Sequence, residues 1–600
     1  MKRPMLLLIT LLLAALAGTV AADAAGACGE PVTRIAAIQG RADVSPRVGE
    51  SLAIEAVVTA AYPDLDGFYV MEPEALRDDD PATSEGLFVY QPGARVNAGD
   101  RLRVTGTVEE YHGLTQLRAT GRRLCERNVP VAPVPLMLPF ADPADREALE
   151  GMLVSVAQPL TVSDTHELAR YGSLTLSHGR LFIPTQVAAP GAPARAVRAA
   201  NALNRIQLDD GSHVGNPATV RYPRGGLAAN NPLRAGYRTR PFQAVLTYGF
   251  QAWRLQPVGE VRFDAANPRS PAPPRAPGSD LRVAAFNVLN YFNGDGDGGE
   301  GGGFPTARGA ISAEELARQQ AKLVAALKGL DADVVGLMEL ENDGYGADAA
   351  LAQLTAALGP DWRYVNPGRE RLGGDAIAVG LIYRHGVVEA LGRAATTDAG
   401  AFRTGGHRLP LAQTFRPRGG GQAITVVVNH FKSKGGCPGR GENAERGDLQ
   451  GCWNAARVAA AGQLLSWLKG DPTGTGKAPW LIIGDLNSYP REDPITRLRD
   501  AGLVDLIRRF QGPETYTYTY RGEAGYLDHA LASEGLMDRV LAAGPWPINA
   551  DEPVAFDYRL PGFQSADQHR RYYAPDPWRA SDHDPVFVDL RLTSPADDAH

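Results

Sequence analysis

The sequence has only four cysteines in 600 residues, no excess of positive charge, and no long apolar run beyond its first residues. A net charge of −7 excludes a protein that holds polyanions by bulk charge, so any nucleic-acid contact must come from local patches. The shortness of the later apolar runs excludes a bundle of membrane-spanning helices. What remains is a globular composition, 44% hydrophobic and 22% charged, in a chain long enough for two or three domains.

The N-terminus has the pattern of a signal peptide. Lys2 and Arg3 precede the apolar core MLLLITLLLAALAG, and small residues follow up to Ala24. A membrane anchor is the alternative, but the apolar core is shorter than the roughly 20 residues that a spanning helix needs. We therefore predict that residues 1–24 are a signal peptide and that the mature chain is secreted or periplasmic, without a membrane anchor.

The four cysteines predict two disulfides, because an even number in an exported chain is typical of disulfide bonding. Of the three possible pairings, location within a domain favours Cys28–Cys125 and Cys437–Cys452. The second pair would close a polar loop, which is worth roughly 3 kcal/mol in loop entropy. Metal binding is the alternative interpretation, but neither pair has CxxC spacing.

The first part of the chain reads as all-β. Residues 29–126 alternate in runs such as SLAIEAVVTAAY and RLRVTGTVEEY, with glycine and proline between them, and the pattern favours a small OB-like β-barrel domain. Residues 127–266 are less regular and are predicted as a second β-rich domain of unassigned role. Residues 267–280 are proline-rich and predict a linker.

After this linker the pattern changes to α/β, and we predict a catalytic domain over residues 281–593. Short β-branched runs such as LRVAAFNVL, DVVGLME, AITVVVNH and WLIIGD alternate with helical or loop segments. Ser312 and Glu315 are spaced as a capping box before an amphipathic helix. Mixed sheets flanked by helices fit this order.

Polar residues stand at the ends of four of these apolar runs. Asn287 follows VAAF, Glu339 follows VVGLM, His430 follows VVVN and Asp485 follows LIIG. Any one of them could be an ordinary strand-end polar group. Because all four occur in one domain, we expect them to meet at a common rim where loops form a site.

These strings resemble the endonuclease/exonuclease/phosphatase superfamily, which has the DNase I-like fold. The matching strings are FNVLNYF, VVGLMELEND, VVNHFKSKG, GDLNSY, YLDHALAS and SDHDPV. The resemblance implies an α/β (α+β) four-layer sandwich at the C-terminus, preceded by the all-β regions. Over residues 33–590 the chain also resembles exported bacterial endonucleases of this superfamily, through strings that include IAAIQG, PTQVAAPG, ANALNRIQLDDG, HRLPLAQTF and INADEP.

The resemblance implies a divalent metal site. Glu339 corresponds to the acidic metal ligand, Asn287 to its companion, and Asp582 to the aspartate that supports the metal or a histidine. Carboxylate and amide oxygens suit a hard cation, so Mg²⁺ or Mn²⁺ is expected. The ion would neutralise charge that develops on the phosphate.

The resemblance also implies a set of catalytic residues. Asp485 and Asn487 correspond to the pair that positions the attacking water and holds the phosphate. His430 and His583 resemble the two imidazoles that flank the scissile phosphate, and Asp528 resembles the carboxylate that orients His583. Histidine suits proton transfer near neutral pH, but which imidazole is acid and which is base stays open.

Substrate contacts are expected beside this site. Arg408 in HRLPLAQTF matches a family arginine expected to contact phosphate, although His407 stands where the family often has asparagine. Lys432 and Lys434 follow His430 and belong to a locally basic segment that could bind a DNA backbone. The alternative for this segment is an ordinary solvated loop.

A glycine-rich run at 293–303 contains Asp295, Asp297 and Glu300. It could hold Ca²⁺ as a structural ion, but it lacks the EF-hand spacing, and a mobile loop is the favoured interpretation.

The sequence therefore predicts an exported, metal-dependent endonuclease that cleaves DNA, with RNA as an open second substrate, and leaves 5′-phosphate products. Two alternatives remain. A phosphatase or phospholipid phosphodiesterase could share the same central residues, and a non-catalytic nucleic-acid-binding protein could retain the fold. The sequence indicates no protein partner.

Overall fold

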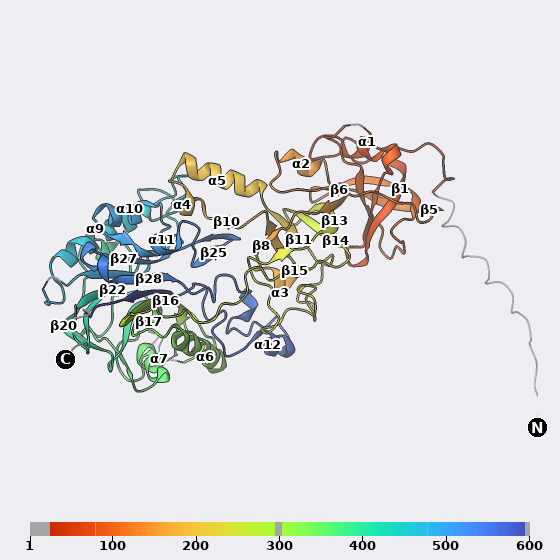
Figure 1. Cartoon of the computed structure of the whole chain (residues 1–600). Coiled ribbons are helices and arrows are strands. Elements are labelled where there is room, and N and C mark those ends of the chain that lie inside the picture. Colours follow the sequence, from red (N-terminus) through yellow and green to blue (C-terminus); the bar gives the residue numbers. More distant parts are fainter. Residues whose placement is uncertain (1–24, 79, 295–302, 477, 594–600) are drawn as a thin grey trace, which may run out of the picture. The chain divides into compact units, whose positions relative to one another are not determined.

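A computed structural model describes residues 25–78, 80–294, 303–476 and 478–593 (Figure 1). The predicted signal peptide, and the carboxylates proposed for Ca²⁺ in the glycine-rich run, lie outside these ranges. Among the described residues, no helix combines the length and the hydropathy needed to cross a bilayer.

The chain divides into two compact units that are each built from separate stretches of sequence. Unit 1 takes the chain up to Pro159 together with Ile206–Val214 and Arg240–Val261. Unit 2 takes Leu160–Arg205, Gly215–Thr239 and the chain from Arg262 onward. Residues 127–266, predicted as one β-rich domain, are thus shared between the two units.

Unit 1 contains a closed five-stranded barrel in the order β1-β2-β3-β5-β4. Its strands are β1 (Ser51–Tyr62), β2 (Gly67–Met71), β3 (Gly86–Tyr90), β4 (Arg101–Tyr111) and β5 (Leu114–Glu126). Alternating side chains such as Val70, Val89 and Val104 are fully buried inside it, as the period-2 pattern requires. The prediction of a strand-rich N-terminal region is confirmed, and its assignment to the OB class stays a prediction.

The rest of unit 1 packs beside the barrel. It consists of α1 (Ile35–Gln39), α2 (Ala144–Glu147), β6 (Val134–Pro135), β7 (Leu153–Val156), β11 (Ile206–Leu208), β13 (Phe242–Gly249) and β14 (Ala252–Val258). Tyr69 in the barrel donates to the Thr247 hydroxyl at 2.9 Å, and Tyr62 donates to the Gln256 carbonyl at 2.9 Å. The predicted Cys28–Cys125 disulfide is present.

The larger part of unit 2 is built on two six-stranded sheets, ordered β18-β19-β17-β16-β29-β28 and β20-β21-β22-β23-β27-β24. The first contains β16 (Leu281–Tyr291), β17 (Val334–Glu341), β18 (Trp362–Tyr364), β19 (Ile377–Arg384), β28 (Val540–Pro545) and β29 (Val586–Leu590). The second contains β20 (Val388–Thr396), β21 (Leu411–Pro417), β22 (Ile424–His430), β23 (Trp480–Asp485), β24 (Val504–Asp505) and β27 (Asp528–Ala532).

The two sheets share one apolar core. Met338 and Leu381 of the first sheet cluster with Val428 and Ile483 of the second. The sheets approach so closely that a Cβ atom added to Gly336 would lie 2.7 Å from Ile483. This contact brings the polar ends of β16 and β17 next to those of β22 and β23.

Helices cover both sheets of unit 2. One apolar cluster joins the first sheet to α6 (Ala313–Leu330) and α7 (Ala350–Leu358). The second sheet packs against α9 (Asn454–Lys469), α10 (Asp493–Asp500) and α11 (Leu506–Gln511). In Figure 1, α6 and α7 lie on one side of the sheets and α9 and α10 on the other. Mixed sheets flanked by helices, as the sequence predicts for this part of the chain, are therefore present.

The capping box predicted for α6 forms in part. Ser312 accepts a hydrogen bond from the Glu315 amide at 3.2 Å. The Glu315 carboxylate accepts from the amides of Ile311 and Leu560, at 2.8 and 2.7 Å, instead of from the amide of Ser312.

Residues 160–205, 215–239 and 262–280 add an accessory layer to unit 2. Its strands are β8 (Thr161–Asp164), β9 (Leu174–Ser177), β10 (Leu181–Phe182), β12 (Arg238–Thr239) and β15 (Phe263–Asp264), and its helices are α3 (Leu168–Tyr171), α4 (Pro184–Val187) and α5 (Ala192–Leu203). Strand β10 forms a three-stranded sheet with β25 (Tyr518–Tyr520) and β26 (Glu523–Gly525). Unit 2 also contains the helices α8 (Ala401–Thr404) and α12 (Ala566–Tyr572).

Buried ion pairs fix this accessory layer. Arg234 and Arg269 both bind the Glu552 carboxylate at 2.7 Å, and Arg180 binds Asp551 at 3.0 Å. The proline-rich stretch predicted as a linker includes Arg269 and so makes part of these contacts.

Candidate active site

Three polar residues lie side by side at one edge of the second sheet. Strands β22 and β23 run parallel and end together, with His430 opposite Asp485. Strand β27 runs the other way and begins with Asp528 opposite Asp485. Because the register places all three in one row, the strand-end prediction for His430 and Asp485 holds geometrically.

A bulge delivers Glu339 from the first sheet. The β17–β19 register shifts between Leu337 and Leu340, and Glu339 has a φ of 65°. Its neighbour strand β16 is irregular at the same level, where Leu289 and Asn290 have φ values of 55° and 51°. Left-handed backbone is uncommon outside glycine and collects at functional sites, where a bulge re-aims a side chain.

Asn287 links the two sheets. It is fully buried, and its amide nitrogen lies 3.2 Å from Glu339 Oε1 and 3.4 Å from Asp485 Oδ2. The other oxygen of Glu339 accepts from the Asn290 amide at 3.0 Å. The polar ends of both sheets therefore form one cluster, as the sequence predicts.

His583 is held by a carboxylate and a ring. Its Nδ1 lies 2.8 Å from Asp528 Oδ2, which leaves Nε2 as the nitrogen that can meet a substrate. Asp528 also accepts from the Thr517 hydroxyl at 2.7 Å. The Tyr518 ring stacks on the imidazole, with centroids 4.5 Å apart and planes 30° apart. The predicted orienting role of Asp528 has the geometry that it needs.

The two histidines have opposite electrostatic surroundings. Burial lowers the pKa of His583, but Asp528 and Asp582 outweigh it and leave that pKa well above the ordinary value. Burial, with the charges of Arg408 and His583, puts the pKa of His430 well below the ordinary value. Environments that move the pKa values of two nearby titratable groups in opposite directions are typical of sites for acid–base catalysis.

Asp485 and Asn487 form the turn that follows β23. His430 Nε2 lies 3.5 Å from Asp485 Oδ2, and the other Asp485 oxygen accepts from the Asn487 amide at 2.8 Å. Asn487 has a φ of 48° and donates from its side chain to the Phe431 carbonyl at 3.1 Å. Burial, with Asp528 and Glu339 nearby, raises the pKa of Asp485 to about 7.

The donor set fits a hard divalent cation. Burial and the charge of Asp582 raise the pKa of Glu339, and a cation would offset both effects. Across the described residues no three His, Cys, Asp or Glu side chains form a ready cage. Glu339 and Asn287 would therefore share the ion with water or phosphate oxygens, an arrangement that Mg²⁺ accepts. For its oxygen to bind, the Asn287 amide would have to turn over.

Arg408 lies at the rim of the cluster. Its guanidinium contacts Asp375 at 3.3 Å and the Phe431 carbonyl at 3.1 Å. His407 is buried, accepts from the Lys432 amide at 2.9 Å and contacts the Ala456 carbonyl at 3.1 Å. Burial lowers the pKa of His407 to about 4. The unusual histidine before Arg408 thus fixes the backbone of the segment that carries Lys432.

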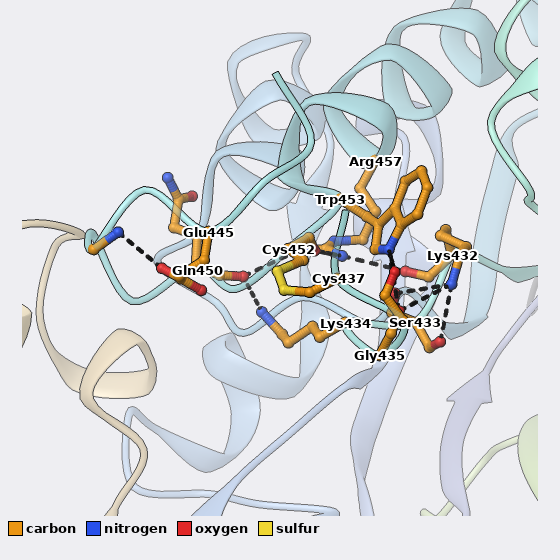
Figure 2. The surroundings of a disulfide bond; sticks show 12 residues. Lys432, Ser433, Lys434, Gly435, Cys437, Glu445, Gln450, Cys452, Trp453 and Arg457 are labelled. Carbon is orange, nitrogen blue, oxygen red and sulfur yellow. Dashed lines mark hydrogen bonds between the residues drawn. A yellow bond between two sulfur atoms is a disulfide. The ribbon is translucent and has the colours of Figure 1, made fainter. Parts of the chain in front are cut away.

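The Cys437–Cys452 bridge forms as predicted and closes a loop beside this segment. Figure 2 shows Lys434 on one side of the bridge, and Lys432 with Trp453 on the other. The Lys432 ammonium lies 5.0 Å from the Trp453 ring centre and 3.4 Å from the Ser433 hydroxyl. Lys432, which is partly exposed, is therefore held beside the loop by Trp453 and Ser433.

Lys434 and Arg457 serve the loop itself. The Lys434 ammonium contacts the buried Glu492 carboxylate at 2.6 Å, and burial lowers the pKa of Lys434 to about 8. Arg457 is fully buried and donates to the Cys452 carbonyl at 2.8 Å. The basic segment therefore offers fewer free cations than its sequence predicts, because Glu492, distant in the sequence, binds one of them.

Sequence reasoning missed two residues of the site. The run YTYTY at residues 516–520 includes strand β25, and it brings Thr517 to Asp528 and Tyr518 to His583. The aromatic run is visible in the sequence, but its contacts with Asp528 and His583 depend on the tertiary structure.

Residues 284–583 match the profile of the Endonuclease/Exonuclease/phosphatase family. Similar solved structures include a family member from Bacteroides thetaiotaomicron, at 15% identity and a TM-score of 0.32, with 52% of this chain and 97% of that chain covered. The human Nocturnin catalytic domain with bound sulfate has 16% identity, coverage of 52% and 94%, and a TM-score of 0.33. D. rerio TDP2 complexed with a single-strand DNA product has 16% identity, coverage of 52% and 98%, and a TM-score of 0.31. No curated protein matches the sequence significantly.

Proposed function

The chain belongs to the endonuclease/exonuclease/phosphatase family, and on that premise we propose that it is a divalent-metal-dependent endonuclease that cleaves DNA. One observation carries the proposal. His583–Asp528 and His430–Asp485 lie in one buried cluster with Glu339 and Asn287. The family is typically hydrolytic and generally depends on a divalent ion, typically Mg²⁺.

The residues around the phosphate would divide the work by position. Asp485 and Asn487 hold the attacking water, whose oxygen bonds to phosphorus as the bond to the 3′ oxygen breaks. His583, held through Nδ1 by Asp528, presents Nε2 to the phosphate, and His430 flanks it beside Asp485. Glu339 and Asn287 would hold Mg²⁺ or Mn²⁺, which supplies positive charge to a phosphate oxygen. The product retains a 5′-phosphate.

A local set of cations supports a nucleic-acid substrate. Arg408 lies close enough to the cluster for its charge to lower the pKa of His430 and of Glu339. Lys432 lies in the segment after His430, beside the loop that the Cys437–Cys452 disulfide closes. Phosphate groups on either side of the scissile bond would meet these side chains, which position a backbone without reading sequence. RNA offers the same phosphates and is the natural second substrate to test.

The N-terminal pattern and the two disulfides support export. Structural disulfides persist in oxidising compartments, and both predicted bridges form. We propose that the mature enzyme acts in the periplasm or outside the cell, with the N-terminal barrel as a binding module for nucleic acid.

The test is cleavage of supercoiled plasmid by the purified mature protein with Mg²⁺, with and without a chelator. We expect nicking that the chelator abolishes and that the His430→Ala variant lowers at least about 100-fold. Turnover of a phospholipid or a sugar phosphate without DNA cleavage would instead indicate the other hydrolases of this fold. DNA binding without any turnover would indicate a binding protein.

A further inference from the structure

The accessory layer touches the active site through a segment that lies outside the family match. Strand β10 pairs in parallel with β26, with Leu181 opposite Glu523, and the Ile183 amide donates to the Ala524 carbonyl at 3.0 Å. Helix α4 follows directly. Its residues therefore stand against the β25–β26 hairpin, which lies inside residues 284–583.

Gln186 on α4 binds both ends of that hairpin. It is fully buried, and its amide nitrogen donates to the carbonyls of Pro513 and Thr515, each at 3.0 Å. Its amide oxygen accepts from the Tyr526 amide at 3.1 Å. Two donated bonds and one accepted bond use the side-chain amide fully, and no other natural side chain of this shape offers the same set.

The hairpin carries the two contacts that hold His583. Thr517, two residues after a carbonyl bound by Gln186, donates to Asp528 at 2.7 Å, and Asp528 holds the imidazole at 2.8 Å. Tyr518, the next residue, stacks on the same ring. The Thr517 carbonyl also accepts from the Asp584 amide at 2.7 Å, directly after His583.

A second contact from α4 reaches Glu492, which binds Lys434 in the segment that follows His430. The buried Thr185 hydroxyl donates to Glu492 Oε1 at 2.7 Å, and the same carboxylate binds Lys434. Beyond α4, the Gly191 amide donates to the Asp448 carbonyl at 2.8 Å, within the Cys437–Cys452 loop. The segment thus contacts both loops that flank the two histidines.

We propose that Gln186 is a positioning residue, by which the accessory layer sets the orientation of His583 through the β25–β26 hairpin. It touches no reacting atom. Its effect passes from the Pro513 and Thr515 carbonyls to Thr517, and from there to Asp528 and His583. The kinetic part of this inference rests on the proposed nuclease function, while the bracing of the hairpin does not.

The test compares Gln186→Met, which removes all three hydrogen bonds, with Gln186→Glu, which keeps only an acceptor for Tyr526. The matched control is Gln568→Met, which removes another buried side-chain amide of unit 2. The hydrogen-bond partners of Gln568 are Ser565 and Pro217, and neither belongs to the hairpin. With a labelled double-stranded oligonucleotide and Mg²⁺, kcat should fall roughly 10- to 100-fold in the Gln186 variants. KM should stay within about 2-fold, because Gln186 touches no substrate.

A double-mutant cycle separates positioning from general destabilisation. In a Thr517→Val background the Gln186 substitution should lower kcat by less than about 2-fold further, because both act on the same contact. The Gln568→Met control should have the same small effect in both backgrounds. Equal kcat in Gln186→Met and wild type, or full additivity with Thr517→Val, would overturn the inference. If Gln186→Met does not fold, Gln186→Glu carries the same comparison.

Hydrogen exchange tests whether Gln186 stabilises the β25–β26 hairpin, and this test does not depend on enzyme activity. Peptides covering residues 513–526 should exchange at least about 10-fold faster in the folded Gln186 variant than in wild type or Gln568→Met. Unchanged exchange there would overturn the inference whatever the enzyme cleaves. Inactivity of the wild type on nucleic acid would count against the proposed function alone, and exchange would then decide the role of Gln186.

Discussion

At the scale of single residues, buried carboxylates occur in two kinds of place, within the candidate active site and elsewhere in the fold. Asp485, Asp528 and His583 are buried and Glu339 is partly buried, and these three carboxylates and the imidazole lie close enough for their charges to interact. Glu85 in unit 1 is different. It is only 4% exposed, and its Oε1 accepts from the Asp78 amide at 2.8 Å. Its Oε2 is buried without a hydrogen-bond partner in the described structure.

Replacing Glu85 with glutamine should therefore change stability in a pH-dependent way. Burial raises the pKa of Glu85 to about 7, from an ordinary value near 4.5. The native state thus binds more protons than the unfolded state between these values, and wild-type stability falls as pH rises through that window. We expect Glu85→Gln to be more stable than wild type by about 1–2 kcal/mol at pH 8 and to lose this advantage by pH 4.

Urea unfolding at pH 4, 5.5 and 8, followed by hydrogen exchange of unit 1 peptides, measures this difference. Glu50→Gln is the matched control, because Glu50 is about half exposed and its carboxylate pairs with Arg47 at the surface. A constant difference between Glu85→Gln and wild type across the pH range would contradict the argument.

At the scale of elements, a bulge in a strand can direct a side chain where the regular alternation of a strand would not place it. Strand β17 points alternate side chains to opposite faces until the bulge at Glu339, where a φ of 65° re-aims the carboxylate toward Asn287 and Asn290. Partial burial of this carboxylate beside Asp582 destabilises the metal-free protein, and a bound cation would offset that cost.

Removing the charge of Glu339 should therefore have opposite effects with and without metal. We expect Glu339→Gln to unfold at a higher temperature than wild type in the presence of a chelator. Mg²⁺ at about 100 times its Kd should add about 2.7 kcal/mol to wild type and nothing measurable to the variant. Differential scanning fluorimetry across a Mg²⁺ titration gives both values. Glu534→Gln, at an exposed position, should respond to Mg²⁺ as wild type does, and equal Mg²⁺ responses in all three proteins would exclude Glu339 as a ligand.

The sequence predicts the strands and the polar residues near their ends, but not the bulge or the contacts between distant segments. Apolar runs with polar ends predict β16, β17, β22 and β23, and the residues that follow them come together as expected. The bulge at Glu339 leaves no mark in a run such as VVGLMELE. The pairing of Lys434 with Glu492 spans 58 positions and depends on tertiary contacts that no local pattern reports. The contact of Gln186 with the hairpin is hidden for the same reason, at a separation of more than 300 positions.

At the scale of the whole molecule, unit 2 is not confined to the family match. Asp551 and Glu552 are at most 2% exposed, and their partners Arg180, Arg234 and Arg269 all lie before residue 281. A buried carboxylate without its partner costs several kcal/mol.

Residues 281–593 expressed alone should consequently be unstable. We expect aggregation, or a melting temperature more than about 10 °C below that of unit 2 in the full chain, because the lost ion pairs remove about 3–5 kcal/mol each. The same fragment carrying Asp551→Asn and Glu552→Gln should recover part of this loss. Calorimetry and size-exclusion chromatography compare the three proteins. A fragment as stable as the full chain would mean that the accessory layer contributes nothing to folding.

The interleaving of the two units has a consequence for biogenesis. All the segments of unit 1 have been synthesised once Val261 has left the ribosome, whereas unit 2 needs residues near position 590. The ion pair between Arg180 and Asp551 cannot form until Asp551, 371 residues later, has been synthesised. Ion pairs and hydrogen bonds at such separations close late, because the entropy of long loops opposes them. The barrel can therefore fold early, while the catalytic centre can assemble only after residues near position 590 have been synthesised, so activity should appear after the barrel has folded.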